Sequence, residues 1–218
     1  MSKIVLETQY FPPIAYFSTL LQADSLVLEA CEHFQKGSFR NRCAIATSMG
    51  IHILSVPLKK GKNTQQPIRE VAISYDMSWQ KQHWQALRTA YGSAPYWEHY
   101  SPVFEKFFTK KYPYLFDLNF EILETVLTIL KIKNSLTISL STDYKPIYTD
   151  GTSLWNIPKQ AGNNREGGDF RNTITPKTNH FDSKKYPQLF EDRNGFIPNL
   201  SILDLVFCCG NQAKEVLI

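Results

Sequence analysis

The sequence lacks any run of about 18 apolar residues, the length that a helix needs to cross a lipid bilayer. It therefore predicts no membrane-spanning helix. The opening stretch, MSKIVLETQYF, also lacks the basic segment, apolar segment and small-residue cleavage site of a secretory signal peptide. We accordingly expect this protein to be in the cytoplasm.

Cysteine is scarce, and no CxxC pair occurs among the four cysteines. They are Cys31, Cys43, Cys208 and Cys209, of which the last two are adjacent. A disulfide framework or a zinc site needs paired and regularly spaced cysteines, so this pattern indicates reduced, mostly buried thiols. The sequence predicts no metal site and identifies no cofactor.

The common motifs of nucleotide and hydrolase chemistry are missing too. There is no GxGxxG after a strand, no P-loop, no HExxH and no GxSxG. A strong excess of one charge is also absent, because 24 Lys and Arg residues face 20 Asp and Glu residues, for a formal charge of +4. The lysines at 59–62, 106–111 and 184–185 are scattered. We expect no nucleic-acid partner, although the mild basicity permits an anionic ligand.

Aromatic residues, in contrast, are plentiful at 13%, within an apolar content of 43% over 218 residues. This length and composition can bury a sizeable core, either in one large domain or in two small ones. We interpret residues 1–218 as a single domain. Its α/β part is expected at 1–76, a helical lobe at 77–133, and an irregular tract with a C-terminal helix at 134–218.

The apolar patterns predict an α/β fold. Residues 3–8 and 25–30 are typical of strands, and Pro12-Pro13 can begin a helix between them. A β-α-β order normally makes a parallel pair of strands. Further strands are expected at 42–47, 51–58, 67–74 and 135–141, and helices at 79–91, 101–111, 117–133 and after Ser201. The prediction is a partly parallel mixed sheet opened by a β-α-β unit, with a helical lobe in the middle and a C-terminal helix.

The stretch TQYFPPIAYF follows the first expected strand and holds the first candidate site residues. Ligands of open α/β sheets bind beyond the carboxyl ends of strands, and Gln9 and Tyr10 stand at that point. Gln9 offers a donor and an acceptor, and Tyr10 offers a ring face with a hydroxyl. The alternative is that the aromatic residues only pack under the first helix.

A second candidate is KGSFRNR, which places Arg40, Asn41 and Arg42 before a strand. If this segment is extended, Arg40 and Arg42 share one face and suit capture of a phosphate or carboxylate. The alternative is a solvated loop. Asp24, Glu29 and Glu32 lie close by in the sequence. They indicate either a catalytic or metal-binding set or, as the more favoured interpretation, a structural ion-pair network.

A third candidate is formed by Trp79 and His83, which lie four residues apart and therefore on one helical face. The near-neutral pKa of histidine makes His83 a candidate for acid–base chemistry, unless it is hydrogen-bonded at an interface. Gln188 remains a candidate for ligand binding. Ser201 and Asp204 fit a helix-capping box, which would explain both residues structurally.

Taken together, these motifs resemble the WbqC-like protein family along nearly the full chain. The resemblance is carried, in order, by QYFPPIAYF, ADSLVLEACEHFQKGSFRNR, LSVPLKK, SWQKQHWQALRTAYGSAPYW and YPQLFEDRNGFIPNLSILDLVF. Each motif is moderately specific, and five in the right order make a strong case. Two departures are Ala15, where the family often has glycine, and residues 142–180, where an irregular tract replaces a regular passage.

The resemblance implies a setting in the biosynthesis of bacterial surface polysaccharides, O-antigen included. One hypothesis it supports is a transferase that adds an acyl or aminoacyl group to a nucleotide-linked sugar, which would be its small-molecule partner. In this hypothesis the catalytic residues are His83, which would move a proton, and Gln9, which would line the site. Tyr10, Trp79 and Gln188 would bind the ligand. Its phosphate or carboxylate would be held by Arg40, Asn41 and Arg42.

A second hypothesis is a non-catalytic binding or scaffold protein of a biosynthetic complex. It would be favoured by an exposed patch of Trp79, Trp84, Tyr96 and Trp97. The oligomeric state is not predicted.

Overall fold

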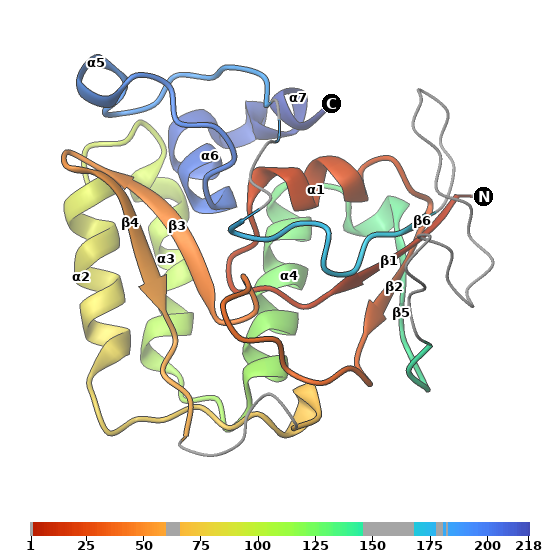
Figure 1. Cartoon of the computed structure of the whole chain (residues 1–218). Helices are drawn as coiled ribbons and strands as arrows, with labels where there is room; N and C mark the ends of the chain where they lie inside the picture. The colour runs from red at the N-terminus through yellow and green to blue at the C-terminus, as the bar shows by residue number, and fades with distance from the viewer. Residues whose placement is uncertain (1, 60–65, 146–167, 178–180, 182) are drawn as a thin grey trace.

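A computed structural model describes residues 2–59, 66–145, 168–177, 181 and 183–218 (Figure 1). Its strands are β1 (Lys3–Glu7), β2 (Ser25–Glu29), β3 (Arg42–Thr47), β4 (Gly50–Ser55), β5 (Thr137–Leu140) and β6 (Gly168–Asp169). Its α-helices are α1 (Ile14–Leu20), α2 (Trp79–Tyr91), α3 (Trp97–Thr109), α4 (Leu115–Ile129), α5 (Glu191–Asn194), α6 (Ile202–Cys209) and α7 (Ala213–Leu217). The α/β fold class is confirmed.

The main sheet has four strands in the order β5-β2-β1-β6, and each neighbouring pair is parallel. Strands β1 and β2 are apolar and buried almost throughout, as strands covered on both faces must be. Their register pairs Glu7 with Glu29, so two carboxylates end neighbouring strands at the same edge. The predicted β-α-β opening is confirmed.

The antiparallel hairpin of β3 and β4 is a separate two-stranded sheet and confirms the predicted turn at Gly50. Figure 1 shows it beside α2 and α3, at the opposite end of the molecule from the parallel sheet. The strand predicted at 67–74 is wrong. Residues Ile68–Glu70 form a short 3₁₀-helix, followed only by isolated bridges at Ala72 and Ile73. Pro67 fixes the backbone torsion at the start of this turn.

The helical lobe explains the aromatic residues that follow β1. Phe11 is fully buried, and its ring packs face to face with Phe108 and edge to face with Phe104 and Phe107 of α3, each at 5.9 Å. Such a cluster contributes both buried area and favourable ring geometry. Phe11 therefore attaches the segment after β1 to the helical lobe. Of the two interpretations offered for this aromatic residue, ligand site or packing, the structure shows packing.

None of the helices in the described residues is long and apolar enough to cross a membrane. The expected helix boundaries at 79–91 are met by α2, whereas α3 begins at Trp97 and α4 at Leu115, earlier than the pattern indicates. Pro102 lies inside α3, in its second turn.

Gly210 ends α6 with a backbone φ of +53°, and a Cβ atom there would clash with the ring of Tyr96. Gly195 also has positive φ, +67°, but open space lies around it. We expect Gly195→Ala to lower the free energy of unfolding by about 1 to 3 kcal/mol through backbone strain. Gly210→Ala should lower it by about 1 to 3 kcal/mol more, because overpacking adds to the strain. Urea denaturation of both variants measures the difference, and equal losses would contradict the packing at Tyr96.

Candidate active site at the carboxyl ends of the parallel strands

Charged side chains gather where β1, β2 and β6 end. Each of these strands ends in a buried carboxylate, namely Glu7, Glu29 and Asp169. Parallel strands bring their carboxyl ends to one edge, which is where open α/β sheets bind ligands. We use the name strand-end network for the following set of residues: Glu7, Gln9, Glu29, Glu32, Arg40, Asp169, Arg171 and Asn172.

Arg171 joins two of the strand ends. Its Nη1 donates to Glu29 Oε2 at 2.5 Å, and its Nη2 donates to Asp169 Oδ2 at 2.5 Å. Ser141, directly after β5, donates its hydroxyl to Glu29 Oε1 at 2.6 Å. The cluster is buried, so each charge depends on the others for compensation.

Arg40 forms a second cluster with Glu32. Its Nε and Nη2 donate to the two oxygens of Glu32 at 2.7 and 2.5 Å, and Nη2 also donates to Asn172 Oδ1 at 2.8 Å. Burial raises the pKa of Glu32 to about 7, although the hydrogen bonds from Arg40 oppose the rise. A carboxyl group with a pKa near neutral can take up or release a proton during a reaction.

Glu7 and Gln9 form the third part of the network. Gln9 Nε2 donates to Glu7 Oε1 at 2.8 Å and to the carbonyl of Ile174 at 3.2 Å. Glu7 Oε2 accepts from the backbone N–H of Asn172 at 3.0 Å. Gln9 is only 2% exposed, yet its Oε1 has no hydrogen-bond partner within the described chain. A buried acceptor without a donor carries a desolvation cost, so it indicates a ligand or an ordered water at this point.

Tyr10 and His83 form a separate hydrogen-bonded pair. The Tyr10 hydroxyl lies 3.0 Å from His83 Nδ1, and the His83 ring also hydrogen-bonds the Ser55 backbone. Burial lowers the pKa of His83 to about 4. The near-neutral pKa on which the acid–base prediction depended is therefore absent, because the ring is 6% exposed among other rings. This histidine therefore fits the alternative interpretation, in which it is hydrogen-bonded at an interface.

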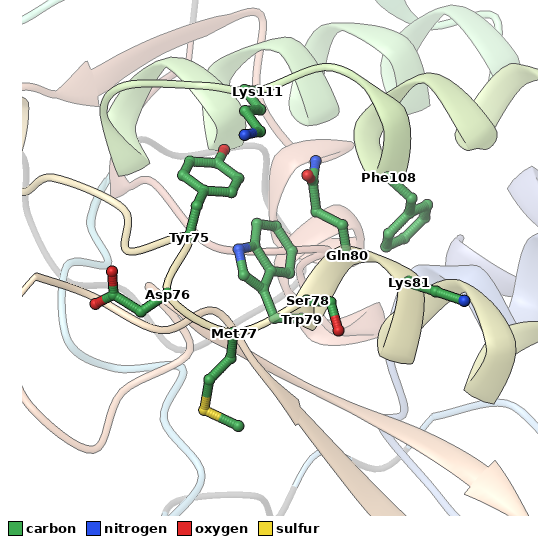
Figure 2. A pocket seen from close by; sticks show the side chains of 9 residues that line it. All are labelled: Tyr75, Asp76, Met77, Ser78, Trp79, Gln80, Lys81, Phe108 and Lys111. Carbon is green, nitrogen blue, oxygen red and sulfur yellow. The ribbon is translucent and has the colours of Figure 1, made fainter.

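Trp79 forms one wall of an open pocket of about 550 Å³ at the start of α2. Figure 2 shows its indole beside the Tyr75 ring, with Lys111 close to that ring. The Trp79 indole N–H has no hydrogen-bond partner among the described residues. None of the residues that line this pocket belongs to the strand-end network, and the Trp79 ring centroid lies 5.1 Å from that of His83. We regard it as a secondary candidate.

The remaining predicted site residues lie apart. Arg40 is buried, whereas Arg42 is exposed as the first residue of β3, so the two do not share a face. The reason is that residues 38–41 form a turn instead of an extended segment. Asn41 donates its amide to the Val56 carbonyl at 3.0 Å, which is a structural contact. The anion clamp predicted from all three residues is not assembled.

Gln188 belongs to a buried cluster around Asp204. Asp204 accepts from the hydroxyls of Tyr91 at 2.8 Å and Tyr186 at 2.6 Å, and Gln188 Nε2 donates to the Tyr186 hydroxyl at 3.0 Å. Ser201 does cap α6 by accepting from the Leu203 N–H, but Asp204 does not complete the capping box. Its carboxylate instead joins the end of α2, through Tyr91, to the segment that carries Tyr186.

The pKa of Asp204 gives a pH-dependent prediction. Burial raises it from 3.8 to about 6, despite the tyrosine hydrogen bonds. A raised carboxyl pKa means that the folded state binds the proton more tightly, so this stabilisation is present below about pH 4 and is lost as the pH rises through 6. Relative to Asp204→Asn, we expect the wild type to lose about 2 to 3 kcal/mol between pH 4 and pH 7 in urea denaturation. If the free energies of unfolding of the wild type and Asp204→Asn changed equally with pH, the raised pKa of Asp204 would be contradicted.

Sequence reasoning misses four members of the strand-end network. Glu7 is interpreted as the end of an apolar strand, although a single acidic residue closing such a strand is itself a signal. Asp169, Arg171 and Asn172 fall in the irregular tract, where β6 is too short, at two residues, to produce a pattern. The predicted ion-pair network is present at Glu29 and Glu32, with Arg171 as an unforeseen partner, whereas Asp24 accepts from the Ser2 N–H at 2.8 Å.

Comparisons with known proteins identify a matching family and one relative. The model of the WbqC-like protein family matches residues 8–216. A relative from Mycobacterium tuberculosis (strain ATCC 25618 / H37Rv), the uncharacterized protein Rv1507c, is 27% identical over 232 residues, which cover 100% of this chain and 98% of the relative. No solved structure matches.

In the described residues, no group of three or more His, Cys, Asp or Glu side chains is arranged to hold a metal ion.

Proposed function

This chain belongs to the WbqC-like protein family, and from that premise we propose that it is a transferase with its active site at the strand-end network. The reaction is transfer of an acyl or aminoacyl group to a nucleotide-linked sugar. The setting is the cytoplasmic biosynthesis of bacterial surface polysaccharide of the O-antigen type. The observation that carries the proposal is the group of buried ionisable side chains at the carboxyl ends of three parallel strands.

Acyl transfer needs a group that accepts a proton from the attacking nucleophile. Glu32 supplies it, because its pKa of about 7 leaves a useful fraction of both protonation states at neutral pH. The nucleophile of the sugar attacks the acyl carbon, the bond from that carbon to the donor's leaving group breaks, and the nucleophile's proton passes to Glu32. Gln9 orients the acceptor through its free Oε1. In this account His83 positions Tyr10 and transfers no proton.

The test is a product assay by mass spectrometry. The purified protein is incubated with acyl-thioester or aminoacyl-ester donors and a panel of nucleotide-linked sugars. We expect a product heavier than one of the sugars by the mass of the donated group. If no donor and acceptor pair in the panel gives a product, the transferase proposal loses its support.

A binding or scaffold role is the second candidate, although not on the surface predicted for it. Trp84, Tyr96 and Trp97 are partly buried against the core, and Trp79 is 3% exposed. Exposed apolar side chains do alternate along β4 and its turn, at Met49, Ile51 and Ile53. Sedimentation velocity with enzymes of the same pathway tests this role. An association that Ile53→Asp abolishes would support it over catalysis.

A further inference from the structure

The strand-end network contains more carboxylates than guanidinium groups. Four buried acidic side chains, Glu7, Glu29, Glu32 and Asp169, surround two buried arginines, Arg40 and Arg171. Glu29 and Asp169 pair with Arg171, and Glu32 pairs with Arg40. Buried charges are normally compensated by an opposite charge, and this set has an excess of negative charge when all members are ionised.

Glu7 is the carboxylate of this set that makes no ion pair and no hydrogen bond with a guanidinium group. Its two oxygens accept from neutral donors, the Gln9 side chain at 2.8 Å and the Asn172 backbone at 3.0 Å. None of the ion pairs among the described residues includes Glu7. Arg40 is near enough to interact with it: burial opposes the charge of Arg40, but Glu7 and Glu32 outweigh this and raise its pKa. The guanidinium hydrogen bonds of Arg40 nevertheless go to Glu32 and Asn172.

The orientation of the Gln9 amide is fixed by its neighbours. Nε2 donates to two acceptors, Glu7 Oε1 and the Ile174 carbonyl, so exchanging the amide N and O would set oxygen against oxygen. The unpartnered atom is therefore the acceptor Oε1, in a side chain that is 2% exposed. Since Nε2 of the same amide donates to Glu7 Oε1, the free acceptor and this carboxylate belong to one hydrogen-bonded pair of side chains.

A group that suits both acceptors carries positive charge and several N–H donors. We propose that the Glu7 carboxylate and Gln9 Oε1 form a binding subsite for a primary ammonium group, and that the acceptor of the transfer is an amino sugar. The second half of this inference rests on the proposed function. A divalent cation is the less favoured occupant, because no three-residue ligand set surrounds the position in the described chain.

The chemistry balances with an amine as the acceptor. The bound ammonium first releases one proton to a carboxylate of the network, which leaves the neutral amine. Its nitrogen forms a bond to the acyl carbon of a thioester or ester donor while the bond from that carbon to sulfur or oxygen breaks. The second proton passes from nitrogen to the departing thiolate or alkoxide, and the product is an amide.

Isothermal titration calorimetry tests the subsite without turnover. The probes are glucosamine, N-acetylglucosamine and glucose, which differ in the charge and donors of one substituent. We expect the wild type to bind glucosamine at least tenfold more tightly than either neutral sugar. Glu7→Gln, which keeps the size and acceptor oxygen of the side chain, should lose this preference. Glu124→Gln on α4 makes the same charge change at a partly exposed carboxylate and should keep it.

Three results would overturn the proposal. The first is a wild type with no preference for glucosamine, a comparison that needs no variant and holds even if Glu7→Gln does not fold. The second is a preference that Glu7→Gln retains. The third is magnesium or calcium chloride that binds the wild type but not Glu7→Gln, without any response to glucosamine, which would identify the position as a metal site. Amine binding without any product in the transfer assay would refute the transferase and leave the subsite standing.

Discussion

Replacing Arg171 by alanine is expected to lower the free energy of unfolding by about 3 to 5 kcal/mol. Arg171 is 2% exposed, and its guanidinium group donates to Glu29, to Asp169 and to the Lys145 carbonyl. Without it, the buried carboxylates of Glu29 and Asp169, at the ends of β2 and β6 on either side of β1, lose their compensating charge. In a protein of this size, the loss corresponds to roughly 6 to 20 °C in melting temperature.

The matched control is Lys133→Ala. Lys133 pairs with Glu124 at 3.1 Å, but both side chains are substantially exposed, so the solvent screens the interaction. We expect this variant to change the free energy of unfolding by about 1 kcal/mol or less. Urea denaturation at neutral pH compares the two. A loss below about 1 kcal/mol in Arg171→Ala would show that the network does not compensate its charges as the contacts indicate.

Glu32→Gln is expected to lower kcat by about 10²- to 10⁴-fold, the usual contribution of a proton-transfer group. The substitution keeps the size of the side chain and one acceptor for Arg40. In the wild type, the rate should rise as the pH passes through about 7, because the raised pKa of Glu32 makes its ionised form available only there. The variant should lack this dependence.

The assay for Glu32→Gln is the mass-spectrometric product assay over a range of pH, with circular dichroism to verify folding. Glu124→Gln again serves as the control, with an unchanged rate expected. A Glu32→Gln variant that keeps wild-type turnover and the same pH profile would exclude Glu32 as the proton acceptor. Ligand binding would then have to test whether the active site lies at the strand-end network.

The parts of the fold that depend on local pattern could be predicted from the sequence. Apolar runs at β1 and β2, the glycine in the β3–β4 turn and the apolar face of α2 each determine an element with little help from distant residues. The segment 67–74 could not be predicted in this way. Its alternation resembles a strand, but the backbone hydrogen bonds of Ile73 and Ser74 go to distant loop residues, Pro113 and Pro57.

The candidate site was less accessible to sequence reasoning, because its members come together only through sheet topology. Glu29 pairs with an arginine 142 positions away. Arg171 follows a strand of two residues, which is too short for any periodicity to reveal. Arg40 and Arg42 illustrate the converse error: proximity in sequence suggested one anion-binding pair, whereas the turn at 38–41 buries the first and exposes the second. Gln9 was identified because the carboxyl end of a strand is a general site of ligand binding.

A crystal structure of the protein with a nucleotide-linked amino sugar tests the location of the site most directly. The account predicts that the sugar lies at the strand ends, with its nitrogen within hydrogen-bonding distance of Gln9 Oε1 and the Glu7 carboxylate. Electron density for the ligand in the Trp79 pocket (Figure 2), with Gln9 Oε1 free of any ligand contact, would contradict it and would move the site to the start of α2.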